Sequence, residues 1–308
     1  MQAGGDYRGS GISPGLDGDL TEISATAQVS RNEIVHVMHS WDSLTIAEQT
    51  LMRRAVSGYS LAGMVQNYGV ALRWAGSADA PPLRSFTEDE QRALVPQLAT
   101  VALDLAERGL LTVHEGESHR AIAPVLVTGP ELNEVLTDPA NWLWTSRPRR
   151  HFSLTAPQPV REHWFDDAHP TADTSALPTW DELSVEEREV LVCATEASGM
   201  LTGAFGIWED PPANLGTTER LAWVDQQLAP LLPFVREGWI EVQHCPDEGS
   251  DAFTVIPLEG LRTAFTDPAI RYQGDEWGVG IGCILTYAGL AVWRGGWASE
   301  WGRRLTFD

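Results

Sequence analysis

Two groups of histidines have a spacing that metal ions use. His36 and His39 would lie on one face of a helix, and His163 and His169 flank two aspartates in the segment EHWFDDAHP. A zinc site also needs further ligands and a regular frame that fixes their geometry. No Cys, Asp or Glu recurs at ligand spacing beside the first pair, and the second group lies in a proline-rich connector. We therefore predict no metal ion in either place.

Catalysis by a nucleophile would need a base and an orienting group beside it. Of the three cysteines, Cys193, Cys245 and Cys283, only Cys245 follows a histidine. His244 and Cys245 would point to opposite faces of a strand. The sequence has no G-x-S-x-G elbow and no phosphate-binding loop, and GVGIG at 278–282 lacks the spacing of a dinucleotide fingerprint. The sequence predicts a protein that is not an enzyme and holds no cofactor.

A basic segment, SRPRRHF, could bind a partner. It contains Arg147, Arg149 and Arg150, with Phe152 alongside. These side chains could contact nucleic acid or an acidic surface. We favour the other interpretation, that they neutralise acidic neighbours of the same chain across the seam between the domains.

The C-terminal segment WRGGWASEW is a second candidate for partner binding. It contains Trp293, Arg294, Trp297 and Trp301 among Gly and charged residues. Exposed Trp and Arg side chains are typical of interface hot spots. These residues could bind a protein partner or a second copy in a homodimer, and the alternative is that they pack locally onto the second repeat.

The elements that must position these residues come from an internal duplication. WDSLTIAEQTLMRRAVSGYSLAGM, from Trp41, reappears as WDELSVEEREVLVCATEASGMLTG, from Trp180, and each copy later contains the tetrapeptide TDPA. Thr45 with Glu48, and Ser184 with Glu187, form matching capping boxes, which predict a helix start in each copy. The two tryptophans just before these boxes are expected to be core residues that hold the start of the helix.

Each copy is predicted to run helix, helix, helix, strand, strand, helix. The second segment covers 61–74 and 201–208, and the third helix is marked by apolar residues at helical spacing over 94–105 and 221–235. Pro96 in the first copy, and Pro230 and Pro233 in the second, are expected to kink or split that helix. A hairpin and a short final helix, 131–136 and 259–265, complete each copy.

A helix that ends in AERGLLTV or VREGWIEV and leads into a hairpin resembles the winged-helix domain. The resemblance implies an α+β fold of two tandem winged-helix-like domains with pseudo-two-fold symmetry. The expected parts are a flexible tail (1–20), a first repeat (21–146), a linker (147–179), and a second repeat with a Trp/Gly-rich C-terminal extension (180–308). The third helices and wings are rich in acids, which departs from the basic reading surface of DNA-binding members.

Charge narrows the choice of partners. The chain has 308 residues and a net charge of −22, and all 21 of its basic residues are Arg. The net charge is −9 over 1–146, zero over 147–179 and −13 over 180–308. Such a field repels nucleic acid and anionic membranes and favours basic partners.

Cysteine usage and hydropathy indicate the compartment. Three scattered cysteines do not make a disulfide framework, so a reducing cytoplasm is expected. The polar N-terminal segment MQAGGDYRGSGISPG does not read as a signal peptide. The longest apolar run, 279–293, is shorter than the roughly 20 residues that span a bilayer, so we expect a buried strand or helix there.

The sequence therefore predicts a non-catalytic, acidic interaction or adaptor module that binds a protein partner, with a basic partner favoured. The first alternative is a DNA-binding transcription regulator that contacts phosphate through Arg53, Arg54 and the 147–150 segment. The second is a small-ligand sensor, which an unfilled cavity lined by Trp74, Trp208 or Trp223 would favour.

Overall fold

The structure is a computed structural model, and it describes residues 40–308 except 82, 117–123, 145–149, 196–198, 205, 248–251, 273–275 and 300–308. These residues belong to one compact unit that begins at His39. The expected flexible tail lies outside the described residues, and so does the part of the first repeat before residue 40.

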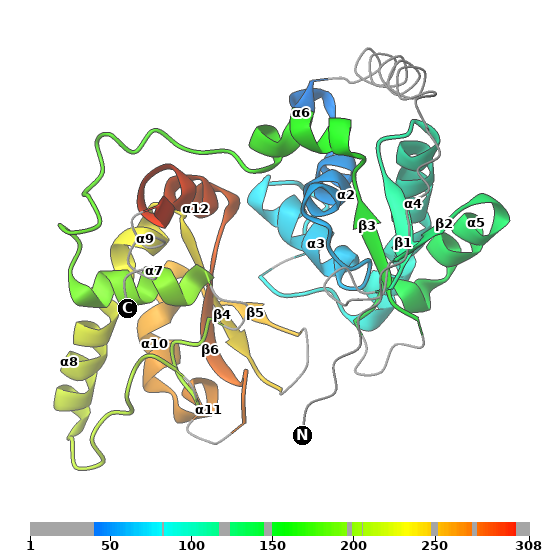
Figure 1. The fold of residues 1–308 in the computed structure, drawn as a ribbon. Helices are drawn as coiled ribbons and strands as arrows, with labels where there is room; N and C mark the ends of the chain where they lie inside the picture. The colour runs from blue at the N-terminus through cyan, green and yellow to red at the C-terminus, as the bar shows by residue number, and fades with distance from the viewer. Residues whose placement is uncertain are drawn as a thin grey trace, which may run out of the picture. The chain divides into compact units, whose positions relative to one another are not determined.

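The first half of this unit, residues 41–168, begins with helices and ends with a strand and a helix (Figure 1). Its elements are η1 (Trp41–Ser43), α2 (Ile46–Ser57), α3 (Met64–Trp74), α4 (Glu88–Glu107), β1 (Thr112–Glu115), β2 (Val125–Val127), α5 (Gly129–Thr137), η2 (Pro139–Asn141), β3 (Phe152–Thr155) and α6 (Gln158–Ala168).

The second half, residues 180–297, follows a closely similar order. Its elements are α7 (Val185–Thr195), α8 (Thr217–Leu228), α9 (Leu232–Arg236), β4 (Ile240–Cys245), β5 (Thr254–Val255), η3 (Leu258–Gly260), α10 (Leu261–Thr266), α11 (Pro268–Arg271), β6 (Gly280–Leu285), α12 (Tyr287–Val292) and η4 (Trp293–Trp297).

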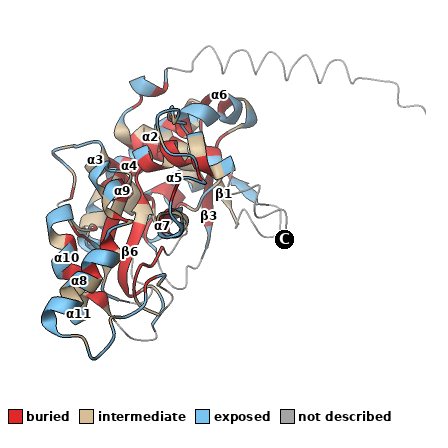
Figure 2. Ribbon diagram, turned by 90° about the vertical axis from the view of Figure 1, so that its left-hand side faces the viewer, coloured by how far each residue is buried: buried red, intermediate tan, exposed pale blue. Residues whose placement is uncertain are grey.

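The fold is mixed α+β, with one antiparallel three-stranded sheet in each half. The strand orders are β2-β1-β3 and β5-β4-β6, so the predicted hairpins are present and each gains a third strand. The central strand of each sheet pairs with the third strand at an equivalent position: Val113 of β1 pairs with Leu154, and Val242 of β4 pairs with Cys283. Buried residues follow most of β6 and the inner faces of the helices around it (Figure 2).

The third strands lie in regions that the sequence analysis placed outside the repeats. β3 and α6 fall within 147–179, which was expected to be a linker, while β6 and α12 fill the apolar run at 279–293. The same backbone hydrogen bond holds each strand, from Leu61 N–H to Phe152 O and from Leu201 N–H to Ile281 O, both at 2.8 Å. The duplicated unit therefore extends beyond the part that sequence similarity revealed.

Each half contains one pair of tryptophans that pack against each other, and the two pairs lie at equivalent positions. Trp41 packs edge-on against Trp164 of α6 at 5.9 Å, and Trp180 packs edge-on against Trp293 at 5.8 Å. Trp297 is only 2% exposed, and it donates from Nε1 to the carbonyl of Pro178. Trp293 and Trp297 therefore pack locally onto the second half, the alternative that the sequence left open, because burying their large apolar area in the second core is favourable.

The helix signals in the sequence are largely confirmed. The capping boxes form at α2, where Thr45 and Glu48 exchange hydrogen bonds, and at α7, where Ser184 and Glu187 do the same. The third helix of the second half is split into α8 and α9 around Pro230, whereas α4 runs unbroken through Pro96. The second segment forms α3 in the first half, but the described residues of 201–208 form no helix.

The halves are joined by backbone pairing as well as by side chains. Residues 83–85, which precede α4, add to the outer edge of β5: Val255 N–H donates to Leu83 O at 2.8 Å, and Ser85 N–H donates to Phe253 O at 2.9 Å. This pairing protects one sheet edge from other strands. No helix in the described part of the chain is long and apolar enough to cross a bilayer.

Candidate functional site

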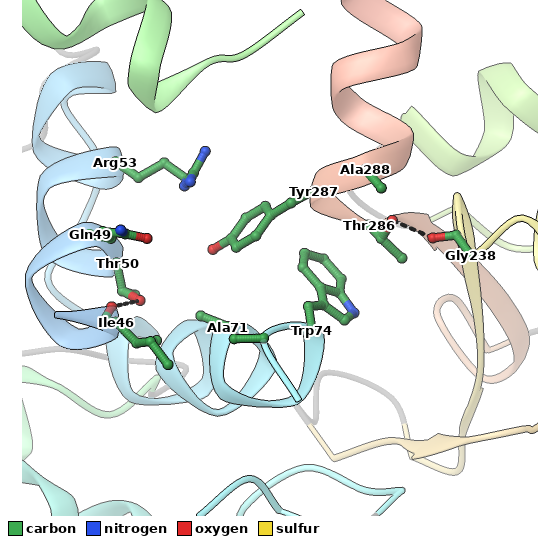
Figure 3. A pocket seen from close by; sticks show the side chains of 11 residues that line it. Ile46, Gln49, Thr50, Arg53, Ala71, Trp74, Gly238, Thr286, Tyr287 and Ala288 are labelled. Carbon is green, nitrogen blue, oxygen red and sulfur yellow. Dashed lines mark hydrogen bonds between the residues drawn. The ribbon is translucent and has the colours of Figure 1, made fainter. Parts of the chain in front are cut away.

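A pocket of about 240 Å³ lies where α2, the end of α3 and the start of α12 meet (Figure 3). We call it the seam pocket because both halves contribute to its wall. Its lining residues are Ile46, Gln49, Thr50, Arg53, Ala71, Trp74, Ala75, Gly238, Thr286, Tyr287 and Ala288. None of them is acidic, although the chain has more than twice as many acids as arginines.

Helical spacing brings the first-half residues together. Ile46, Gln49, Thr50 and Arg53 repeat at the intervals that form one face of α2. On the other side, the hydroxyl of Thr286 caps α12 by accepting from Gly289 N–H at 3.1 Å, and it donates to Gly238 O at 2.6 Å. This cap fixes the first turn of α12 and thereby places the tyrosine that follows it.

Tyr287 forms the centre of a stack of rings and guanidinium. Its ring meets Trp74 edge-on at 4.7 Å, and the guanidinium of Arg53 lies 4.2 Å from its centre and 5.4 Å from that of Trp41. Figure 3 shows the tyrosine ring between Arg53 and Trp74. Burial raises the pKa of Tyr287, so its hydroxyl stays protonated at neutral pH and remains a hydrogen-bond donor.

The charge of Arg53 is not balanced by a carboxylate in the described part of the chain. Its Nη1 donates to the carbonyl of Ala168, and its buried Nε has no acceptor. Burial lowers the pKa of Arg53, the charge and hydrogen bond of Tyr287 raise it in part, and the nearby charge of Arg54 lowers it. A desolvated cation without a counter-ion is costly, and an anion bound beside it would offset that cost.

Arg294 adds to this positive region. Burial lowers the pKa of Arg294, and the charge of Arg53 lowers it further, which places the two guanidiniums within electrostatic reach of each other. His169 responds to the same pair: burial lowers its pKa, and both arginine charges add to that effect. The positive charges of Arg53 and Arg294 therefore act on each other and on His169, whose lowered pKa leaves its imidazole neutral at neutral pH.

The nearby carboxylate, Glu241, is already engaged. It accepts two hydrogen bonds from Arg73, at 2.9 and 2.7 Å, one from Trp74 Nε1 at 3.1 Å and one from Gln243 at 2.7 Å. The Arg73 and Glu241 side chains are only 11% and 9% exposed. This buried pair ties α3 to β4 and orients the indole of Trp74.

The residues that the sequence analysis selected for partner binding do not form one surface. Arg150 is bound to Glu115 at 2.6 and 2.7 Å and to Glu131 at 2.7 Å. Trp293 and Trp297 are core residues, and Arg294 lies partly buried near the seam pocket. Arg147, Arg149 and Trp301 lie outside the described residues.

The histidines and cysteines are also accounted for. His36 and His39 lie outside the described residues, and no group of three metal-ligating side chains occurs among the residues that are described. The thiol of Cys283 is buried and lies 4.0 Å from the thiol of Cys193, a hydrogen bond that, with burial, raises its pKa. Burial also raises the pKa of Cys245 to about 11, so this thiol is protonated at neutral pH.

Sequence reasoning found only part of the seam pocket. It named Arg53 as a phosphate contact and Trp74 as a cavity residue, but it missed Tyr287, Gln49 and Thr50. One usable signal was present: Arg53 is the eighth residue after the Thr45 cap, and the eighth after the Ser184 cap is Val192. A charge that appears in one copy only is not required by the shared fold.

Comparison of the chain with models of protein families, with curated proteins and with solved structures finds no match. The class of the protein is therefore defined by its own features: an α+β chain with two similarly ordered halves and an arginine-containing pocket lined by both of them.

Proposed function

We propose that this chain is a non-catalytic binding protein that senses a small anionic molecule in the seam pocket. The observation that supports this most directly is Arg53, a partly buried cation without a described carboxylate partner, stacked on Tyr287 in a pocket without acids. Because the protein is strongly acidic overall, the absence of acids from the wall of this pocket favours the binding of an anion there.

The size and walls of the pocket limit the ligand further. Its volume, about 240 Å³, is below the roughly 300 Å³ at which pockets for drug-sized ligands begin. Tyr287 and Trp74 offer flat apolar surface, and Gln49 and Thr50 offer hydrogen bonds. A small carboxylate with a short apolar or planar body fits these features.

A sensor role is supported by where the walls come from. Arg53 and Trp74 belong to the first half, whereas Tyr287 and Thr286 belong to the second. A ligand that contacts both halves adds its binding energy to the contacts that join them. Such a ligand therefore shifts the equilibrium toward the arrangement in which the two halves are in contact, by as much as it binds that arrangement more tightly.

The test is a thermal-shift and calorimetry screen with small carboxylates and inorganic phosphate as probes. At a probe concentration of 100 times Kd, the linkage relation predicts a rise in Tm of about 5 °C for a chain of this size. Arg53→Gln should abolish this rise, because it removes the charge and keeps a polar side chain.

The matched control is Arg92→Gln, which removes an equal charge from α4, at a residue that does not line the seam pocket. It should retain the response. If both variants respond like the wild type, or if no probe shifts Tm, the proposed ligand class is wrong.

We also propose that each half derives from a winged-helix unit, with a third strand added at its C-terminal side and pseudo-two-fold symmetry between the copies. The order α2, α3, α4, β1, β2 supports this in the first half. A crystal structure tests it: the two halves should superpose over their helices and all three strands. The free cysteines among the described residues agree with the proposed cytoplasmic setting.

A basic protein partner is a second candidate, favoured by a hollow of about 530 Å³ on the second half. It is lined by Glu186, Glu189 and Glu209 together with Trp208 and Trp223. Carboxylates beside aromatic rings favour an arginine side chain. DNA binding has less support, because Arg92 of α4 and Arg108, the residue that follows α4, are ion-paired with acids of the same chain.

An arginine-rich peptide separates this candidate from general charge attraction. Changing the three glutamates of this hollow to Gln should weaken the peptide at least about tenfold, or about 1.4 kcal/mol. The control variant changes Asp89, Glu107 and Glu134, exposed acids of the first half, to their amides. Equal weakening in both would show attraction by net charge alone.

A further inference from the structure

A larger hollow, of about 520 Å³, is lined by Arg54, the residue of α2 that follows Arg53. We call it the Trp144 hollow. Arg54, Tyr59, Asn67, Trp144 and Phe253 are the lining residues that matter for its chemistry. Like the seam pocket, it has no acidic residue in its lining.

Two aromatic side chains of this hollow are unusually exposed. Trp144 is 59% exposed and Tyr59 is 51% exposed, whereas Trp142, two residues before Trp144, is completely buried. The segment that leads into Trp144 is held by hydrogen bonds from Trp142 Nε1 to Leu136 O and from Gly63 N–H to Trp142 O. Trp144 is therefore presented by an anchored loop, and its open ring can stack on a flat ligand.

Arg54 is held in place without an ion pair to any described residue. Its Nη2 donates to Asn67 Oδ1 at 2.7 Å, and its guanidinium lies over the ring of Tyr59 at 4.8 Å. A guanidinium fixed in this way loses little further freedom when it binds an anion, and it still has unused N–H donors.

The other polar side chains of the hollow are mostly occupied. Gln66 donates to the carbonyl of Phe86 at 3.2 Å and accepts from its N–H at 3.3 Å. Gln243 donates to Glu241 at 2.7 Å. The donors of Arg54 therefore dominate the polar chemistry, and the hollow favours a ligand that brings acceptors or negative charge.

We propose that the Trp144 hollow binds a flat aromatic ring that bears an anionic group, with the ring stacked on Trp144 and the anion at Arg54. This site is separate from the seam pocket, because the two hollows share no lining residue. An aromatic carboxylate and a nucleoside monophosphate both have the required chemistry, and direct comparison of the two identifies the source.

Calorimetry on the full chain tests the proposal with indole-3-carboxylate and adenosine monophosphate as probes. Adenosine, which has a ring but no charge, and acetate, which has a charge but no ring, serve as the two partial probes. At least one of the two probes should bind saturably, and both partial probes should bind at least about tenfold more weakly, equivalent to about 1.4 kcal/mol.

Variants locate the binding. Trp144→Ala and Arg54→Gln should each weaken the bound probe about tenfold or more. Trp277→Ala, at an exposed tryptophan elsewhere, and Arg53→Gln, in the seam pocket, should leave this affinity unchanged. Circular dichroism confirms that each variant is folded, which is expected for Trp144 because its side chain is largely in solvent.

The proposal is overturned if neither probe binds at millimolar concentration, or if affinity is insensitive to Trp144→Ala or to Arg54→Gln. Loss of binding in Arg53→Gln alone would assign the probe to the seam pocket and also overturn the Trp144 site. Because Arg53 and Arg54 are tested separately, failure of either site leaves the other open to its own result.

Discussion

The first half and the second half share a scaffold but differ at the positions that line pockets. After matched capping boxes, α2 carries Arg53 and Arg54, and α7 carries Val192 and Cys193 at the same places. The two arginines line hollows, whereas Cys193 is buried in the core of its half. Residues that the copies share maintain the fold, and residues that they do not share form the candidate sites.

The last helix of each half shows the same division. Tyr287 is the first residue of α12 and projects into the seam pocket, while Gln158, the first residue of α6, donates to Glu162 at 2.8 Å on the surface. Further along, Trp164 and Trp293 make the same edge-on contact with the tryptophan that precedes the first helix. Within one helix pair, the packing position is shared and the pocket position is not.

The strongest test of this equivalence is to remove each tryptophan of the matched pairs. Trp164→Ala and Trp293→Ala should each lower the free energy of unfolding by about 3–5 kcal/mol, because both leave a large buried cavity. Trp164→Phe should cost much less, since the Nε1 of Trp164 is buried without an acceptor. Urea unfolding measures all three. A large loss in one half only would show that the two positions are not equivalent.

A second test uses a position where the central strands differ. Glu241→Ala removes a carboxylate that binds Arg73, Trp74 and Gln243, and it should destabilise the fold by about 3–5 kcal/mol because it leaves a buried charge unpaired. The equivalent residue of β1 is Thr112, whose hydroxyl donates to Thr155 O at 3.0 Å. Thr112→Ala should cost about 1 kcal/mol. Similar losses in urea unfolding would contradict this ranking.

Local signals in the sequence predicted the local elements, and the misses came from contacts between distant segments. The capping box at Thr45 and Glu48 spans only four residues, so it could be recognised directly. The strand FSLT, 152–155, is short, and it forms by pairing with β1, a segment about forty residues earlier in the chain. The burial of Trp297 likewise depends on Pro178, which no local pattern indicates.

The candidate site was hidden for a related reason. Gln49, Thr50 and Arg53 form a polar stripe on α2, and such a stripe ordinarily faces water. Here it faces Tyr287 from the other half, and only the tertiary structure brings them together. The sequence contained one indication of the site: Arg53 in the first copy stands where the second copy has Val192.

Acid titration sharpens the comparison of the third helices. In α4, hydrogen bonds from Arg84 and from the Thr87 cap lower the pKa of Glu90 from 4.5 to about 2. A lowered carboxyl pKa stabilises the fold above pH 4.5, and this contribution is lost as pH falls from 4.5 toward 2. Wild-type stability should therefore fall over this range more steeply than that of Glu90→Gln. In α8, the equivalent acid Glu219 accepts from Gly216 N–H at 2.9 Å, and Gly216 offers no side-chain hydroxyl.

The smallest stability effect is expected where the first half is made to copy the second, in Arg53→Val. The substitution loses the stacking of the guanidinium on Tyr287 and Trp41, but it also removes the cost of burying a cation without a described counter-ion. These terms oppose each other, so the free energy of unfolding without ligand should change by about 1 kcal/mol or less. The anion-dependent rise in Tm should nevertheless disappear. If Arg53→Val unfolds the chain, Arg53 is a structural residue of the seam. If the variant keeps the response to anions, the charge that appears in only one copy is not what binds them.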